Sequence, residues 1–373
     1  MRILFCSPVP LDPRLGMGKH WLELADSLRG LGWETHAVGP DEIAGGPTLA
    51  SPETFPTALR DYLRRNAAGY DVIEYDHAYL PFPRSEFPSG PLFVARCMLL
   101  AHHFLTDPVP PQPGLWRGLR HILSAGGRRR RVEWIVGQTD ATVRHTDLTI
   151  VSNDRDAAAL VRNGADPDRI AVLPLGLTSQ RLRQFAAVSD VVPDRPVVGF
   201  VGTFDPRKGM REFPRLVDRV SRQVAGATFR LLGTAGLVPD VDGVLRHFPR
   251  RLRPLLDVRP RFVPEELPGL LDGVSVGVFP SRVESFGYGV LEMLAAAVPV
   301  IAYDAPGPHA MLPADFRVEV GDDAEMAARV VGLLSDPARL RAARRWARAR
   351  AGDFRWDEIA ARTANVYVRR LAG

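Results

Sequence analysis

The chain of 373 residues exceeds the usual size of a single hydrophobic core, which favours two domains of similar size. Hydrophobic residues make up 46% of the chain and charged residues 24%, as in an ordinary globular protein, and no apolar run reaches the roughly 18 residues of a membrane-spanning helix. The formal net charge of +5 is compatible with anionic ligands but does not indicate nucleic-acid binding.

The N-terminus and the cysteines bear on the cellular compartment. The apolar part of MRILFCSPVP is too short for a signal peptide and predicts a first strand instead. Cys6 and Cys97 provide neither a disulfide framework nor the spacing of a metal-ligand set. We therefore expect a cytoplasmic, reduced protein without a bound metal.

The first part of the chain alternates strand and helix patterns. Apolar runs predict strands at residues 3–7, 34–39, 71–75, 92–96, 148–152 and 170–175. Amphipathic periodicity predicts helices at about 19–31 and 54–66. This alternation predicts an α/β domain over residues 1–185, with a parallel sheet and helices on both faces.

A long loop, Pro8 to Gly18, is expected after the first strand, and it ends in Gly16-Met17-Gly18 before Lys19. The third glycine of the dinucleotide fingerprint is absent, so this signal is weak when taken alone. Of the 48 basic residues only Lys19 and Lys208 are lysines, and both follow the first strand of a half-chain. A compact ammonium suits phosphate oxygens, so the lysines mark two candidate anion-binding loops.

Further polar groups follow in the first half. His102 and His103 come one to two helical turns after the strand at 92–96, where they either contribute to a site or serve as capping or partly buried polar groups. Four consecutive arginines, residues 128–131, are expected at a helix start. They form either a solvated face or a surface for an acidic acceptor or an anionic membrane.

The second half repeats the plan after a linker at 186–195. Strands are predicted at residues 197–201, 228–233, 261–263, 274–279 and 299–304, which gives a second Rossmann-like domain over 196–355. The loop after its first strand reads Gly202-Thr203-Phe204-Asp205-Pro206-Arg207-Lys208-Gly209. A final helix is expected from about Trp356.

The stretch from Val278 to Leu294 carries the strongest chemical signal. A strand, a polar loop and a helix follow one another, which points free backbone N–H groups and the positive end of the helix dipole at one place. Glu284 and Glu292 bracket this turn. Carboxylates repel an anion, so they suit the hydroxyl groups attached to it, as in a phosphorylated sugar or a nucleoside joined to one.

The segment PSRVESFGYGVLEMLAAAVPVIAYDAPG resembles the E-x7-E signature of family-4 retaining glycosyltransferases of the GT-B fold, the glycosyl transferases group 1. The resemblance implies two Rossmann-like domains that face each other across a cleft, with the acceptor on the first and the nucleotide-sugar donor on the second. It also implies that the final helix, 356–373, returns to the first domain.

The resemblance further implies a role for each matching residue. Glu284 would hold sugar hydroxyls, Glu292 the ribose, and the segment around Val263 the base. The donor diphosphate would be held by Gly16, Gly18, Lys19, Thr203, Arg207, Lys208, Phe286, Gly287 and Tyr288. Lys208, Glu284 and His102 are the catalytic candidates.

Three positions depart from the family pattern. Cys97 stands where members carry a histidine, so that histidine would be His102 or His103 here, or absent. Thr203 replaces an arginine, and Leu175 replaces an asparagine before Gly176. A Cys97 nucleophile with histidine partners is a further, less favoured reading.

The expected activity is retaining transfer from a UDP- or GDP-linked sugar to a hydroxyl acceptor, such as a small natural product or a sugar, without a metal or other cofactor. Nucleic acid is not an expected partner. Two alternatives stay open: a GT-B enzyme of other chemistry, namely a sugar-nucleotide epimerase or a non-glycosidic coupling enzyme, and a non-catalytic sugar-nucleotide binder.

Overall fold

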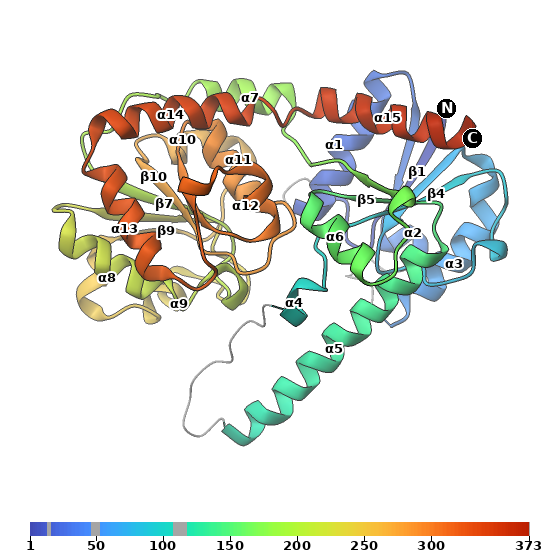
Figure 1. The fold of residues 1–373 in the computed structure, drawn as a ribbon, viewed down its shortest axis with the longest axis horizontal. Coiled ribbons are helices and arrows are strands. Elements are labelled where there is room, and N and C mark those ends of the chain that lie inside the picture. The colour runs from blue at the N-terminus through green and yellow to red at the C-terminus, as the bar shows by residue number, and fades with distance from the viewer. Residues whose placement is uncertain (13–15, 46–52, 107–117, 373) are drawn as a thin grey trace. The chain divides into compact units, whose positions relative to one another are not determined.

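The computed structural model describes residues 1–12, 16–45, 53–106 and 118–372. The chain forms two compact units (Figure 1). The first comprises Met1–Gly176 and Trp356–Gly373, and the second comprises Leu177–Arg355. The division therefore falls nine residues before the expected boundary at 185. The backbone N–H of Leu177 donates to the carbonyl of Phe354 at 2.9 Å, which ties the chain to the second unit from that point.

The first unit is a six-stranded parallel sheet in the order β2-β1-β3-β4-β5-β6. Its strands are β1 (Arg2–Cys6), β2 (Glu34–Val38), β3 (Val72–Asp76), β4 (Leu92–Arg96), β5 (Leu148–Val151) and β6 (Ile170–Val172). Its helices are α1 (Gly16–Gly30), α2 (Pro40–Ala44), α3 (Phe55–Asn66), α4 (His103–Thr106), α5 (Gly118–His145), α6 (Asp154–Arg162) and α15 (Trp356–Ala372). Every residue of β3 and β4 is buried, as expected for parallel strands that are covered on both faces.

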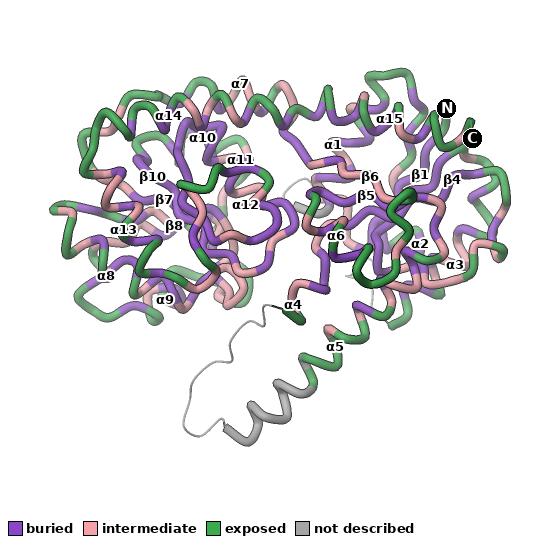
Figure 2. The backbone as a smooth tube through the Cα atoms, in the orientation of Figure 1, coloured by how far each residue is buried: buried purple, intermediate pink, exposed green. Residues whose placement is uncertain are grey.

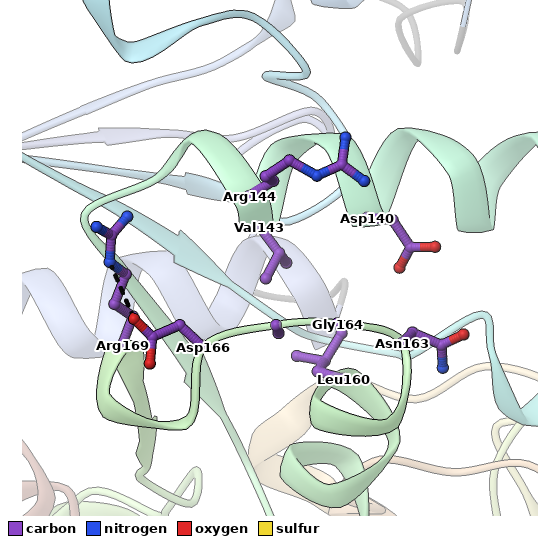
Figure 3. Close-up of a pocket in the computed structure, with 9 residues that line it drawn as sticks. Asp140, Val143, Arg144, Leu160, Asn163, Gly164, Asp166 and Arg169 are labelled. Atoms are coloured by element: carbon purple, nitrogen blue, oxygen red, sulfur yellow. Dashed lines mark ion pairs between the residues drawn. The ribbon is translucent and has the colours of Figure 1, made fainter.

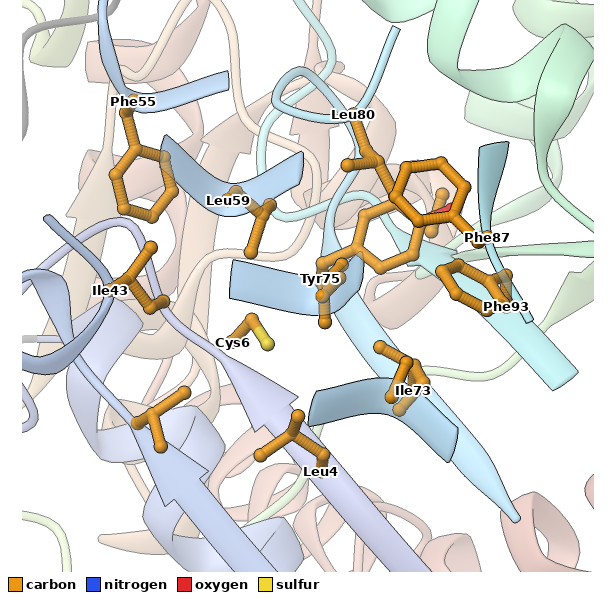
Figure 4. Packing of buried hydrophobic residues seen from close by; sticks show 14 residues of the cluster. Leu4, Cys6, Ile43, Phe55, Leu59, Ile73, Tyr75, Leu80, Phe87 and Phe93 are labelled. Atoms are coloured by element: carbon orange, nitrogen blue, oxygen red, sulfur yellow. The ribbon is translucent and has the colours of Figure 1, made fainter. Parts of the chain in front are cut away.

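One hydrophobic cluster fills the space between α3 and the sheet (Figure 4). Phe55, Leu59 and Leu63 recur every four residues and form the apolar face of α3. They pack with Leu4 of β1 and Ile73 of β3, so helical periodicity on one side meets strand side chains on the other. Figure 2 shows the same division, with buried strands inside and exposed helix faces outside.

The last helix belongs to the first unit, which confirms its expected return. Tyr367 of α15 donates its hydroxyl hydrogen to Glu74 of β3, and Arg96 of β4 donates to the same carboxylate, with Nη2 at 3.2 Å. All three side chains are buried. A buried carboxylate requires such partners, so α15 completes the polar interior of the first sheet.

The second unit is also a six-stranded parallel sheet, in the order β12-β11-β10-β7-β8-β9. Its strands are β7 (Val197–Val201), β8 (Thr228–Leu232), β9 (Leu256–Arg259), β10 (Val276–Phe279), β11 (Val300–Tyr303) and β12 (Arg317–Val318). Its helices are α7 (Ser179–Ala186), α8 (Phe213–Gln223), α9 (Val241–Arg246), α10 (Leu267–Leu271), α11 (Tyr288–Ala295), α12 (Pro306–Met311), α13 (Asp323–Leu334) and α14 (Pro337–Ala351).

Three sequence-based expectations about elements were wrong. The strand expected at 261–263 lies at Leu256–Arg259, because Pro260 has no N–H with which to continue the ladder. Gly16 to Gly18 open α1 instead of ending a loop. The arginines at 128–131 lie inside α5 and not at its start. Among the described residues, no helix is both long and apolar enough to cross a membrane.

Replacing Tyr367 with Phe tests the anchor of α15. The change leaves Glu74 with one fewer donor in a buried site, so the free energy of unfolding should fall by about 1.5–3 kcal/mol. Val368→Ala, at an exposed neighbouring position, is the control and should change little. Urea denaturation measures both, and equal stabilities would contradict the anchoring role.

His20 of α1 gives the first unit a pH-dependent stability. Its ring is fully buried, 5.0 Å from the ring of Trp21 and 5.5 Å from that of Trp356, and neither nitrogen has a hydrogen-bond partner among the described residues. Burial, together with the charge of Arg96, lowers the pKa of His20 well below its ordinary value of 6.5. As the pH falls, His20 therefore binds a proton in the unfolded state before it does so in the folded state.

We expect stability to fall as the pH drops below about 6.5, by up to about 1.4 kcal/mol per pH unit, and to be regained above it. A His20→Leu variant should lose this part of the pH dependence. Urea denaturation of both proteins at pH 5.5 and 7.5 measures it, and identical pH dependences would show that His20 does not titrate as described.

Candidate donor site

The candidate site lies where the strand order of the second sheet reverses. β7 is hydrogen-bonded to β8 on one side and to β10 on the other, so consecutive connections leave this point in opposite directions. In such sheets, ligands bind outside the carboxyl ends of the strands at this reversal. The loop after β7 carries Lys208, and the loop after β10 carries Glu284.

Glu284 is the shared partner of the positively charged side chains at this strand-order reversal. Its Oε2 accepts hydrogen bonds from Lys208 Nζ, from Arg207 Nη1 at 3.2 Å and from Ser281 Oγ at 3.4 Å. Arg207 Nη1 also donates to the carbonyl of Val283 at 3.0 Å. The structure thus brings Glu284 together with Lys208, 76 residues before it in the sequence, and with Arg207, 77 residues before it.

The Lys208 and Glu284 side chains are each only 12% exposed. Burial and the neighbouring charges shift their pKa values in opposite directions. Burial alone raises the pKa of Glu284, but Lys208 and Arg207 together outweigh it, and the pKa lies below its ordinary value. Burial lowers the pKa of Lys208 below its ordinary value, although Glu284 opposes this shift. The carboxylate is therefore ionised, and two cations share one oxygen.

Local backbone geometry places Lys208. Asp205 caps a short 3₁₀ turn, Pro206–Lys208, by accepting from the backbone N–H of Arg207 at 2.9 Å and of Lys208 at 3.1 Å. Thr203 donates its hydroxyl hydrogen to the other oxygen of Asp205 at 2.7 Å, so it supports the turn. Gly209 follows with φ of 85°, a conformation that favours glycine.

The turn before α11 is fixed in a similar way. Gly287 has φ of 93° and precedes Tyr288, the first residue of α11, whose leading N–H groups lack partners within the helix. The backbone N–H of Gly307 donates to the carbonyl of Glu284 at 2.8 Å. Phe286 is buried, and its ring lies 5.2 Å from that of Tyr288. The amides expected to face an anion are therefore held by packing on both sides.

Glu292 lies one helical repeat further along α11 and faces a residue that the sequence analysis did not single out. Arg181 Nη2 of α7 is 3.8 Å from Glu292 Oε1. Arg181 Nη1 also donates to the carbonyl of Pro264 at 2.8 Å, next to the exposed Val263. Val263, Glu292 and Arg181 thus belong to one neighbourhood of the second unit. The sequence offered no signal for Arg181, because Pro264 and Glu292 lie more than 80 residues away from it.

The residues expected in the first glycine loop serve the fold of α1. A β-carbon at Gly18 would lie 2.6 Å from the carbonyl oxygen of Pro10, so glycine permits the 10–12 backbone to pack there. Lys19 Nζ lies 3.8 Å from Glu23 Oε1 within the helix. Gly16 is the first residue of α1. None of these contacts tests the proposed phosphate role.

His102 and His103 each face a carboxylate of the first unit. His102 Nε2 lies 2.8 Å from Asp140 Oδ1, and His103 Nε2 lies 2.6 Å from Asp156 Oδ1. Burial lowers the pKa of His102, although Asp140 opposes the shift, and this favours a neutral ring. Its Nδ1 is buried and has no hydrogen-bond partner within the described part of the chain. A neutral, oriented ring of this kind can accept a proton or a hydrogen bond.

Cys97 lies at the end of β4 beside a histidine that sequence reasoning missed. His77 follows β3 directly, lies against the Cys97 thiol, and has Nδ1 at 3.3 Å from Asp76 Oδ1. Its position at a carboxyl strand end was the available signal. Cys97 is fully buried, and burial raises the pKa of its thiol although His77 opposes this. A buried, protonated thiol is a poor nucleophile, which weakens the Cys97 reading.

A small pocket of the first unit lies between the end of α5 and the turn after α6 (Figure 3). Its volume is about 100 Å³, and its lining includes Asp140, Arg144, Asp166 and Arg169. The turn leads into the start of β6, so the pocket lies at the edge where strands begin. That edge is opposite to the one where ligands bind in such sheets.

Arg129, Arg130 and Arg131 of α5 are exposed, as is Trp134, so this part of α5 presents a basic surface with one large aromatic side chain. Among the described residues, no group of three or more His, Cys, Asp or Glu side chains could hold a metal ion.

Most of the second unit is similar to a known family. Residues 195–336 match the family described as Glycosyl transferases group 1. These matched residues lie within the second unit, Leu177–Arg355. The resemblance inferred from the E-x7-E segment is thereby confirmed, since that segment lies inside the matched residues.

Solved structures identify the fold as GT-B. Sucrose-phosphate synthase from Thermosynechococcus elongatus superposes with a TM-score of 0.76 over 100% of both chains, at 20% identity. HepE of Anabaena in complex with UDP superposes with a TM-score of 0.68 over 99% of this chain and 100% of that chain, at 17% identity. The two parallel sheets with flanking helices confirm the expected α/β fold class.

Curated relatives carry glycosyltransferase names. D-inositol 3-phosphate glycosyltransferase of Streptomyces bingchenggensis is 30% identical over 64% of this chain and 56% of its own length. D-inositol 3-phosphate glycosyltransferase 2 of Catenulispora acidiphila is 33% identical over 64% and 59%. The matches therefore span less than two thirds of these relatives. Alpha-maltose-1-phosphate synthase of Mycobacterium tuberculosis is 24% identical over 94% of this chain and 95% of the relative.

Gly307 offers a test of how the α11 turn is held. A β-carbon there would overlap the carbonyl oxygen of Phe286, so Gly307→Ala should destabilise the protein by about 1–3 kcal/mol and disturb the turn. Gly332→Ala in α13 is the matched control, because no atom lies within 4 Å of its added carbon, and it should stabilise by about 0.4–1 kcal/mol. Thermal unfolding compares them, and a neutral Gly307→Ala would contradict this packing.

Proposed function

We propose that the protein is a retaining glycosyltransferase that moves a sugar from a nucleotide-diphosphate sugar to a hydroxyl acceptor. The observation that carries this proposal is the convergence of Lys208 and Arg207 on Glu284 at the strand-order reversal of a glycosyl transferases group 1 domain. The glycosyltransferase names of the relatives and the UDP bound to HepE support a nucleotide-sugar donor. The proposed nucleotide is UDP or GDP.

The ion pair defines how a donor would bind. The diphosphate takes Lys208 and Arg207 as its partners, together with amides of Phe286, Gly287 and Tyr288. Glu284, relieved of those cations, then accepts hydrogen bonds from sugar hydroxyls, and Glu292 accepts them from the ribose. The base faces the backbone around Val263. Gly16, Gly18 and Lys19 of the first unit remain proposed diphosphate contacts, as does Thr203.

Catalysis in this scheme is electrostatic. Negative charge develops on the departing diphosphate, and prepositioned donors such as Lys208 stabilise it, each by about 2.7–4 kcal/mol when removed singly. This chemistry requires no metal of its own. In this proposal retention proceeds by attack of the acceptor hydroxyl on an oxocarbenium-like centre, on the face that the diphosphate leaves.

The acceptor belongs to the first unit in this proposal. His102, oriented by Asp140 and with Nδ1 buried and unpartnered among the described residues, accepts a hydrogen bond from the acceptor hydroxyl. A small sugar or natural product is the proposed acceptor. The exposed arginines of α5 add a positive surface that suits an acidic acceptor or peripheral contact with an anionic membrane. Turnover with neutral and acidic acceptors, with and without anionic vesicles, separates these cases.

Two other activities give different results with the donor alone. A sugar-nucleotide epimerase isomerises the donor without an acceptor. A non-catalytic binder shows tight binding without hydrolysis or transfer across an acceptor panel. A thermal-shift panel of nucleotide sugars identifies the probe for these experiments, because a ligand at 100 times its dissociation constant adds about 2.7 kcal/mol of stability.

Lys208→Met is the direct test of the mechanism. It removes one donor to the leaving diphosphate, so kcat should fall by about 10²–10³ at saturating donor. Arg222→Met is the control, because Arg222 is exposed on α8 and contacts only Asp218 of the same helix among the described residues. Unaltered turnover of Lys208→Met at saturating donor would reject the assignment.

A further inference from the structure

Arg181 of α7 connects two parts of the second unit that the proposed function assigns to the nucleoside. Its side chain is only 8% exposed, and its guanidinium lies over the ring of Phe185 at 4.8 Å. Nη1 donates to the carbonyl of Pro264 at 2.8 Å, and Nη2 lies 3.8 Å from Glu292 Oε1. One rigid group therefore reaches both the proposed base segment and the proposed ribose carboxylate.

The donors of Arg181 are not all used. Nε and Nη2 are buried and have no hydrogen-bond partner within the described residues. A buried N–H without a partner is costly, so a fold retains one where the loss is compensated. Nη2 is also the guanidinium nitrogen that lies 3.8 Å from Glu292 Oε1, so a small movement of either side chain brings a free N–H within reach of this carboxylate.

We propose that Arg181 is a positioning residue for the nucleoside half of the donor. It orients Glu292 toward the ribose hydroxyls and, through the carbonyl of Pro264, fixes the backbone that faces the base. This inference rests on the proposed function, because it presupposes a nucleotide at Glu292. The planar guanidinium reaches the carbonyl of Pro264 and the carboxylate of Glu292 from one fixed position. A lysine ammonium at the same place lacks this rigid pair of donors.

The test measures how much the ribose hydroxyl contributes to binding in each variant. The probes are UDP, GDP and their 2′-deoxy counterparts, titrated calorimetrically into wild type, Arg181→Met, Arg181→Lys and Arg183→Met. Wild type should bind one ribonucleotide about tenfold or more tightly than its deoxy form. Arg181→Met should lose most of that ratio, Arg181→Lys part of it, and Arg183→Met, changed at an exposed site of α7, none.

The outcomes separate the two proposals. If Arg181→Met weakens the ribonucleotide and the deoxynucleotide equally, or keeps the wild-type ratio, Arg181 does not position Glu292 and the inference is wrong while the proposed function stands. If Arg181→Met does not fold, the ratio of Arg181→Lys decides in the same way. If wild type binds neither UDP nor GDP, the proposed function fails and this inference fails with it.

Discussion

The candidate site of the second unit depends on one largely buried carboxylate, Glu284, that pairs with two cations from another loop. Lys208 and Arg207 carry positive charge into a largely desolvated place, and Glu284 makes that arrangement tolerable. A buried pair of this kind contributes little net stability, but losing one partner leaves an uncompensated charge. The glycines at 209, 287 and 307 permit the two loops to approach closely enough for this pairing. Glu284 thus offsets only part of the positive charge of Lys208 and Arg207, and an anionic ligand would compete with it for these cations.

Sequence reasoning identified the parts of this site that are local in the chain. The E-x7-E segment and the Lys208 loop each follow a buried strand, and the parallel-sheet pattern places the carboxyl ends of strands together. For the same reason two parallel sheets were predicted, although the second was given five strands and the two-residue strand β12 was missed. The strand at 256–259 was displaced in the prediction because its sequence, LDVR, has little apolar character, whereas the apolar Phe262 and Val263 lie just after Pro260.

Contacts between distant residues could not be predicted in this way. Arg181 meets Pro264 and Glu292, and Tyr367 meets Glu74, through folds of the chain that no short pattern encodes. Gly18 illustrates a related limit, because a glycine before a lysine suggested a phosphate loop, while the structure shows a close backbone approach that requires glycine in any case. The acceptor depends on first-unit loops, and a shared fold does not determine a shared substrate.

The anchoring of α15 by Glu74 also has a consequence for biosynthesis. The whole second unit is one uninterrupted stretch of chain, whereas the first unit needs a helix that is translated after it. During translation, Leu177–Arg355 is synthesised before Tyr367, so it can fold while Glu74 and Arg96 still lack the hydroxyl of Tyr367. The nascent first unit therefore has all its strands but lacks its last helix until the end of translation, and the buried Glu74 stays without one of its hydrogen-bond donors during that interval.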